Sequence, residues 1–260
     1  MKIISRLISS LYYEICEKFI YMSWPKSEFK KNGHETIEAF LSKEECEYFV
    51  ELSNSLMRDE SYMINDSAWL TLRKEAGDGL DTKVAQFNML QNVDPQAKEL
   101  FDDGRIISLF EERTNEELSI RSLSIMVDEP DTSTKRSWHV DNLATASYKA
   151  FIYLTDVTKD TNSPFSVISK SHKWGIRRWL TVIINTLGGR NLSDMLVFAP
   201  KGSGKELLGG KGSLILSNQI MFHRGSPFHT EKIRYMMVFY LRRKKDSEEE
   251  FTLGKPEVSN

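Results

Sequence analysis

The N-terminal part of the chain has apolar residues at three- and four-residue spacing. The recurring positions are Ile4, Leu7, Ile8, Leu11, Ile15, Phe19 and Ile20. This spacing places the side chains on one face of a helix, and a proline stops a helix from continuing. The pattern predicts a helix that ends before Pro25 and packs on the domain. An interfacial membrane anchor is the alternative, but the charges on this helix are mixed in sign rather than basic.

A second helix is marked by a capping box at its start. Ser42 is followed three positions later by Glu45, and apolar residues then recur at helical spacing to about Arg58. Residues 95–112 show similar spacing and predict one or two shorter helices. Residues 60–83 combine glycines with polar residues, so we expect a loop-rich stretch that lies over a site.

At Ile120 the pattern changes from helical spacing to alternation. Apolar and small polar residues alternate from Ile120 to Val127, which is typical of a strand with two unlike faces. Further strands are predicted at residues 148–154, 165–168, 213–222 and 234–241. An amphipathic run followed by glycine-rich turns lies between the strands at 165–168 and 213–222 and predicts an inserted helix with loops.

Short strands preceded by helices predict a mainly β (α+β) fold, a double-stranded β-helix or jelly roll with N-terminal supporting helices. The length of 260 residues and 40% hydrophobic content favour a single domain over residues 1–260. Within it we expect mostly helical support and loops at 1–112 and a jelly-roll core at 113–241. A lid would be inserted at 173–211, and 242–260 would form a charged tail.

The composition excludes several classes of function. With 35 basic and 37 acidic residues, the formal charge is −2, so no global field attracts nucleic acid or an anionic membrane. Cys16 and Cys46 make neither a disulfide framework nor a zinc site, and they fit a reducing cytoplasm. No stretch is long enough to span a bilayer, so we expect no transmembrane segment.

Candidate metal chemistry is concentrated in the run Trp138-His139-Val140-Asp141. An imidazole and a carboxylate two positions apart on an extended strand end point to the same side and can bind one metal ion together. A transition metal used for oxygen chemistry needs a third protein ligand on the same face and open positions for co-substrate and O2. His223, which follows an apolar strand, is the candidate for that ligand. Taken singly, a buried histidine is more often an ordinary core residue.

Arg234 is a candidate for binding a co-substrate beside these metal ligands. It lies eleven residues after His223 at the start of the last predicted strand. A guanidinium there can donate two parallel hydrogen bonds to the far carboxylate of a keto-diacid bound at the metal. Arg224 is the next candidate for this role, although we expect it to face solvent or a neighbouring carboxylate.

Four linked blocks resemble the phytanoyl-CoA dioxygenase family of Fe(II)/2-oxoglutarate oxygenases, over roughly residues 84–241. Residues 138–141 resemble the family's W-H-x-D, and residues 153–158 its strand ending in L-T-D. Residues 162–175 resemble N-G-x-L-x-V-I-P-G-S-H-K-x-G, and residues 212–234 resemble the closing H-R-G…R. The third block departs from the family at Ser163, Ser169 and Lys170, which changes its turn but none of the ligands.

The resemblance implies a set of site residues. His139, Asp141 and His223 would hold Fe(II), Arg234 would anchor 2-oxoglutarate, and Tyr153 would face this co-substrate. His172 belongs to the third block and is expected to be a structural hydrogen-bonding residue.

The resemblance also implies a reaction. With O2, the enzyme would convert 2-oxoglutarate to succinate and CO2 while hydroxylating a C–H bond of a small molecule. The presence of Asp141 favours hydroxylation over halogenation, because a small residue there would open a site for halide.

Two other classes stay open. One is a cupin-like metal enzyme without a keto-acid co-substrate, although cupins usually carry more histidines in their first motif. The other is a non-catalytic jelly-roll binding protein in which His139 and Asp141 are ordinary polar residues.

The substrate is not fixed by the resemblance. We expect residues 173–211 and 60–83 to select it, because loops at a barrel mouth vary freely. Arg177 and Arg178, beside two tryptophans, predict recognition of an anionic group. The alternative is an amphipathic helix with solvated arginines.

Overall fold

The computed structural model describes residues 2–58, 67–73, 83–129, 138–141, 147–159, 163–173, 204–226 and 232–246, with isolated positions between 176 and 187. The helices are α1 (Lys2–Ser23), α2 (Glu28–Asn32), α3 (Lys43–Leu56), α4 (Pro95–Asp102) and α5 (Arg105–Thr114), with 3-10 turns η3 (Leu90–Asn92) and η4 (Lys244–Asp246). The strands are β1 (His34–Ile37), β2 (Trp69–Arg73), β3 (Lys83–Asn88), β4 (Leu118–Glu129), β5 (Ser147–Tyr153), β6 (Phe165–Val167), β7 (Lys205–Leu207), β8 (Leu214–Asn218), β9 (His223–Gly225) and β10 (Arg234–Arg243).

Two antiparallel sheets form the body of the fold. The large sheet has seven strands in the order β1-β8-β5-β10-β4-β3-β2, and the small sheet has three in the order β7-β6-β9. A buried apolar cluster joins their facing sides, with Phe151 and Val238 from the large sheet and Phe165 and Val167 from the small one. The mainly β prediction is confirmed.

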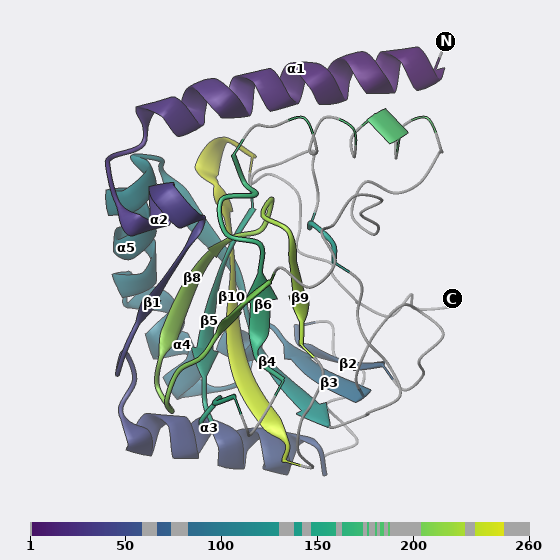
Figure 1. The fold of residues 1–260 in the computed structure, drawn as a ribbon. Coiled ribbons are helices and arrows are strands. Elements are labelled where there is room, and N and C mark those ends of the chain that lie inside the picture. The colour runs from purple at the N-terminus through teal and green to yellow at the C-terminus, as the bar shows by residue number, and fades with distance from the viewer. Residues whose placement is uncertain are drawn as a thin grey trace.

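Helices cover the other face of the large sheet (Figure 1). Phe29 of α2, Phe49 of α3 and Phe110 of α5 are buried in one cluster with Phe239 of β10. Neighbouring residues of a strand point to opposite faces, so Phe239 packs on the helices while Val238 packs between the sheets. The capping box of α3 is also confirmed, since the Ser42 side chain accepts from Glu45 N and the Glu45 side chain accepts from Ser42 N.

The N-terminal region contributes more strand than its sequence pattern indicates. The region expected to be mostly helices and loops also supplies β1, β2 and β3, and β7 lies within the expected lid at 173–211. These strands have only three to six residues, too few for alternation to stand out. They are held by cross-strand pairing, such as β1 with β8 and β3 with β4.

The expected strand at residues 213–222 is wrong in one respect, because the chain leaves the large sheet after Asn218. Met221 N donates to Asn218 O at 3.1 Å, and the Asn218 side chain accepts from Ile220 N at 3.1 Å. This turn ends β8, and His223 begins β9 in the small sheet instead of closing the preceding strand.

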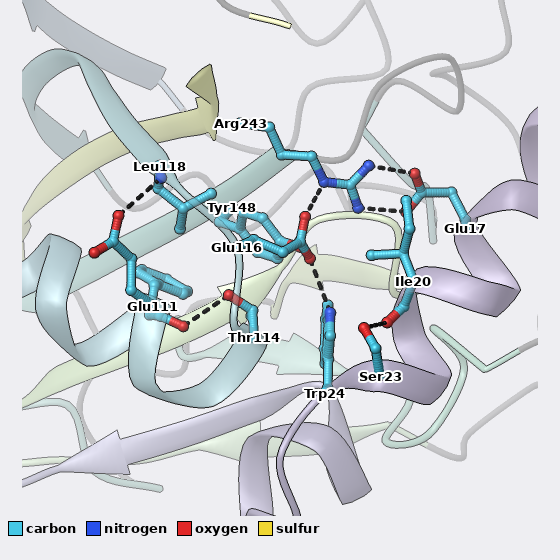
Figure 2. A network of polar contacts seen from close by, with 11 residues as sticks. Glu17, Ile20, Ser23, Trp24, Glu111, Thr114, Glu116, Leu118, Tyr148 and Arg243 are labelled. Atoms are coloured by element: carbon cyan, nitrogen blue, oxygen red, sulfur yellow. Dashed lines mark hydrogen bonds and ion pairs between the residues drawn. The ribbon is translucent and has the colours of Figure 1, made fainter. Parts of the chain in front are cut away.

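The helix expected at the N-terminus is present as α1, but its packing differs from the expectation. One side is held by Glu17, whose carboxylate is in a buried ion pair with Arg243 of β10 (Figure 2). The apolar residues away from this side are largely exposed, including Ile8 at 62% and Phe19 at 66%. No helix in the described part of the chain is long and apolar enough to cross a membrane.

The Arg243 guanidinium links α1 to the sheet through two carboxylates (Figure 2). It contacts Glu17 through both terminal nitrogens and Glu116 through Nε. Glu116 also accepts from the Trp24 indole and from the Tyr148 hydroxyl, each at 2.8 Å. Each buried charge therefore has charged or polar partners, which offset its loss of hydration.

We expect Arg243→Ala to lower the free energy of unfolding by about 3–5 kcal/mol, because two buried carboxylates lose their cation. Urea-induced unfolding followed by circular dichroism measures the loss. Lys244→Ala is the matched control and should change stability by less than ~0.5 kcal/mol, since its contact with Glu117 is 3.9 Å long and its side chain is 59% exposed. Equal stability of both variants would show that the network does not anchor α1.

Candidate metal centre

Three potential metal ligands come together between the two sheets. His139, Asp141 and His223 each offer one donor atom, and these atoms lie within 4.8 Å of one another. Asp141 Oδ1 is 3.7 Å from His139 Nε2 and 3.6 Å from His223 Nε2. Donors bound to one ion at about 2.0–2.2 Å lie roughly 3–4.4 Å apart, so the arrangement fits a single metal ion.

Backbone pairing brings the two histidines together. His139 N donates to His223 O at 3.0 Å, and His223 N donates to His139 O at 2.9 Å, forming an isolated antiparallel bridge. The Asp141 N–H donates to Gln219 O at 3.1 Å, which fixes the end of the same segment. The imidazole rings are 4.3 Å apart between centroids, as expected for side chains that converge on one point.

A backbone contact orients the ring of His223. Its Nδ1 is 2.8 Å from Met221 O, which can only accept a hydrogen bond. Nδ1 therefore donates to Met221 O, and Nε2, which faces Asp141, is the nitrogen left to bind a metal. The ring of Phe165 lies 5.4 Å from that of His223 and forms part of its apolar surroundings.

Asp141 divides its two oxygens between different partners. Oδ1 faces the histidines, whereas Oδ2 contacts the Lys149 ammonium from β5. Loss of hydration alone would raise the pKa of Asp141, but Lys149, His223 and His139 together hold this pKa well below its usual range. The carboxylate is consequently ionised, the form that binds a cation.

Arg234 is buried at the start of β10, beside the small sheet. Its Nε donates to Asp128 Oδ2 at 2.8 Å, a second nitrogen also contacts Asp128, and a third contacts Ser163 O. Ser163 lies two residues before Phe165, whose ring contacts His223. Arg234, the predicted anchor of 2-oxoglutarate, therefore lies next to β6, the strand whose Phe165 contacts His223 of the metal centre.

Tyr153 lies fully buried between the sheets. Its hydroxyl donates to Leu207 O at 2.7 Å and accepts from Phe165 N at 3.2 Å. Burial raises the pKa of Tyr153 to about 12, although the positive charge of Arg234 acts in the opposite direction. The hydroxyl is therefore a neutral hydrogen-bonding group that ties β5 to the small sheet.

Two other residues of the motif blocks have structural contacts. His172 Nε2 is 3.0 Å from Lys30 O, and its ring packs edge-on against Tyr21. The prediction that His172 is a structural hydrogen-bonding residue is confirmed. Arg224, expected to face solvent or a carboxylate, instead lies over the Trp138 ring at 4.6 Å. A guanidinium is weakly hydrated and stacks favourably on an aromatic face.

Arg177 and Arg178, the candidate substrate-binding residues, lie outside the described residues, as do most of the expected lid and of the stretch at 60–83.

The sequence patterns did not identify two charged residues of the site. Lys149 contacts Asp141, and Asp128 holds Arg234. Asp128 falls on the same face of β4 as Ser122 and Ser124, where the alternation already expects polar residues, so nothing in the pattern marked it. Lys149 shares its face of β5 with Phe151 and Tyr153, which are buried between the sheets. A charged residue on this apolar face was the sequence signal that could have identified Lys149 as part of the site.

The comparisons with known proteins agree with this geometry. The family model for phytanoyl-CoA dioxygenase (PhyH) matches residues 29–236. The chain therefore belongs to the phytanoyl-CoA dioxygenase family. A search of curated proteins found no match.

Several solved structures share the fold at low sequence identity. The epimerase SnoN, in complex with Fe3+, alpha ketoglutarate and nogalamycin RO, has a TM-score of 0.61 and 14% identity, covering 83% of this chain and 80% of SnoN. HygX from Streptomyces hygroscopicus, with nickel and 2-oxoglutarate, has a TM-score of 0.59 and 17% identity, covering 84% and 85% of the two chains. EctD from S. alaskensis, with bound Fe, has a TM-score of 0.60 and 15% identity, covering 85% and 76%.

We expect His223→Ala to lose most Fe(II) binding, because two remaining ligands hold the ion far more weakly than three. Isothermal titration with Fe(II) under anaerobic conditions, and with Ni(II) as a redox-stable probe, measures the affinity. His172→Ala is the matched control, since this histidine is also buried but contacts Lys30 and Tyr21 instead. Retention of one tightly bound ion by His223→Ala would remove His223 from the ligand set.

Proposed function

We propose that the protein is an Fe(II)- and 2-oxoglutarate-dependent dioxygenase that hydroxylates a C–H bond of a small molecule. The observation that carries the proposal is the convergence of His139, Asp141 and His223 in a member of the phytanoyl-CoA dioxygenase family. Metal and 2-oxoglutarate in the structure of HygX support it. Two imidazoles and one carboxylate form the ligand set that leaves open positions in non-haem iron oxygenases.

The residues of the centre have separate roles in this proposal. His139 and His223 provide neutral nitrogen ligands, and Asp141 provides an oxygen ligand that offsets part of the metal charge. The Lys149 contact occupies the other oxygen of Asp141, so the carboxylate presents Oδ1 to the metal. Bound iron would activate O2 for the oxidation of both 2-oxoglutarate and the substrate.

The proposal assigns 2-oxoglutarate binding to the side of the centre nearest Arg234. Arg234 would pair with the distal carboxylate of the co-substrate, and Asp128 and Ser163 would hold its guanidinium plane in place. Tyr153 would form part of the wall, where its buried ring excludes water. An ion pair shielded in this way is stronger than one in solvent.

The family assignment disfavours both the cupin-like alternative and the non-catalytic one. We also propose a cytoplasmic location, which agrees with the two free cysteines, Cys16 and Cys46. Substrate selection is assigned on sequence grounds to residues 173–211 and 60–83, with Arg177 and Arg178 recognising an anionic group.

We expect the purified chain to convert 2-oxoglutarate to succinate slowly when Fe(II) and O2 are present without substrate. His139→Ala should reduce succinate formation to background, because the metal loses a ligand from a set of three. Succinate is quantified by mass spectrometry, and His34→Ala serves as the control, since its ring contacts Ser169 rather than the centre. Near-normal turnover by His139→Ala would contradict the assignment.

Arg234 is best tested together with Asp128. Arg234→Gln alone would leave the 1% exposed Asp128 carboxylate buried without its cation and destabilise the fold. We expect the double variant Arg234→Gln/Asp128→Asn to raise the KM for 2-oxoglutarate about ten- to a hundred-fold, because a charge-assisted contact is worth roughly 1.5–3 kcal/mol. Fe(II) affinity should be unchanged.

Asp128→Asn is the matched single control, because it retains the Arg234 charge. Its KM should lie much closer to that of the unmodified chain. If the double variant binds Fe(II) and keeps an unchanged KM, the anchor is another residue, with Arg224 the next to test.

A further inference from the structure

The two oxygens of the Asp141 carboxylate have different surroundings. Oδ1 lies 3.7 Å from His139 Nε2 and 3.6 Å from His223 Nε2, whereas Oδ2 contacts the ammonium of Lys149. The backbone of Asp141 is held by its hydrogen bond to Gln219 O. Only rotation about the side-chain bonds of Asp141 can therefore change which oxygen faces the metal position, and the contact with Lys149 opposes that rotation.

Lys149 lies at a place where a charge is costly. It shares the inner face of β5 with Phe151 and Tyr153, which belong to the apolar cluster between the sheets. Its side chain is only 17% exposed. Loss of hydration disfavours an ammonium in such surroundings, and the contact with Asp141 offsets this loss.

Tyr240 of β10, the neighbour of Lys149 across the large sheet, supports the ammonium from the other side. Lys149 Nζ lies 4.9 Å from the centroid of the Tyr240 ring, a favourable distance for a cation–π contact. The Tyr240 hydroxyl accepts from Gln86 Nε2 at 3.0 Å, and Gln86 Nε2 also donates to Asn88 Oδ1 at 2.8 Å. Contacts that run from β3 through β10 to β5 thus hold the ammonium against Oδ2 of Asp141.

The number of oxygens that Asp141 offers to a metal matters for the proposed reaction. Two imidazoles and one carboxylate oxygen occupy one face of an octahedral ion, and the opposite face stays open for co-substrate and O2. The keto acid group of 2-oxoglutarate takes two of the open positions, so one is left for O2. A carboxylate can also bind a metal through both oxygens. Asp141 would then fill the last position.

We propose that Lys149 is a positioning residue, which keeps Asp141 bound to the metal through Oδ1 alone and so reserves a coordination position for O2. Lys149 acts through Asp141, by occupying Oδ2, rather than on the reacting atoms. The inference rests on the proposed function, because the reserved position has a use only in a reaction with O2.

Nitric oxide is a probe for the reserved position, because it binds Fe(II) where O2 would and gives a characteristic electron paramagnetic resonance signal. The full chain and Lys149→Met are loaded with Fe(II) and 2-oxoglutarate without oxygen, and the signal is measured as nitric oxide is added. Methionine keeps most of the length of lysine and removes its charge. We expect the unmodified chain to bind nitric oxide at every iron, and Lys149→Met at a small fraction of them.

Steady-state kinetics provide a second readout. Lys149→Met should lower kcat for succinate formation by about tenfold or more while the KM for 2-oxoglutarate changes little, since the position for O2 is lost and the co-substrate positions are kept. Its Fe(II) affinity should not fall, because a second oxygen of Asp141 joins the metal. Lys149→Arg should restore both kcat and nitric oxide binding, because a guanidinium also donates to Oδ2.

Lys211→Met controls for the loss of a lysine that is paired with a carboxylate. Lys211 Nζ lies 2.9 Å from Glu47 Oε1, and this pair joins α3 to the turn before β8 without involving the metal centre. Its nitric oxide binding and kcat should match those of the unmodified chain. If Lys149 only stabilised the fold, Lys149→Met would unfold at a lower temperature and keep the same nitric oxide signal per bound iron.

Equal nitric oxide binding per iron by Lys149→Met and the unmodified chain would overturn the proposal. If Lys149→Met does not fold or does not hold iron, Tyr240→Leu replaces it, since this change removes only the ring beside the ammonium. Tyr240→Leu should bind less nitric oxide per iron, and an unchanged amount would equally overturn the proposal. An unmodified chain that binds Fe(II) and nitric oxide but forms no succinate would instead contradict the proposed function.

Discussion

The metal centre depends on a pair of backbone hydrogen bonds between His139 and His223. These residues are far apart in the sequence, and each donates its N–H to the carbonyl of the other. The bridge fixes both imidazoles on the same side of the small sheet. Asp141 then reaches the same point because it lies two positions beyond His139, where the extended chain returns to the same face. The bridge in turn requires the turn after Asn218, which transfers the chain from β8 to β9.

Three pairs of opposite charges lie in separate parts of the fold. Asp141 is paired with Lys149 next to the centre, Arg234 with Asp128 at the start of β10, and Arg243 with Glu17 at its end. An unpaired charge at any of these positions would cost several kcal/mol, on the order of the whole stability of a domain. β10 therefore carries one buried arginine at each end, and one of them positions the proposed co-substrate site while the other attaches α1.

The spacing of apolar residues in α1 does not show which side of the helix faces the domain. The same apolar spacing predicts a helix whether its apolar face is turned toward the core or toward an external surface. In this fold α1 is held on the domain by the ion pair of Glu17 with Arg243 and by Ile20 and Tyr21, which pack against the core. The apolar side chains on the opposite side of α1, such as Ile8 and Phe19, consequently remain exposed.

The sequence predicted a large part of the centre. His139 and Asp141 are local in sequence, and an imidazole and a carboxylate two positions apart on an extended chain must lie on one face. The capping box of α3 was readable for a similar reason, since its two hydrogen bonds join residues three positions apart. Strand β4 was long enough for alternation to identify it, and β5 and β10 contain apolar runs long enough to be predicted as strands.

The sequence alone determined the elements whose pattern is complete within a short segment: the longer helices, the longer strands, the His-x-Asp pair and the motifs of the family. Only the tertiary structure decided that His223 begins a strand of the small sheet, that Lys149 contacts Asp141, and that Asp128 holds Arg234. It also decided that short strands such as β1 complete the large sheet. The physical reason is that these features are pairings between segments distant in sequence, and such contacts exist only after sheet register and packing have placed both partners.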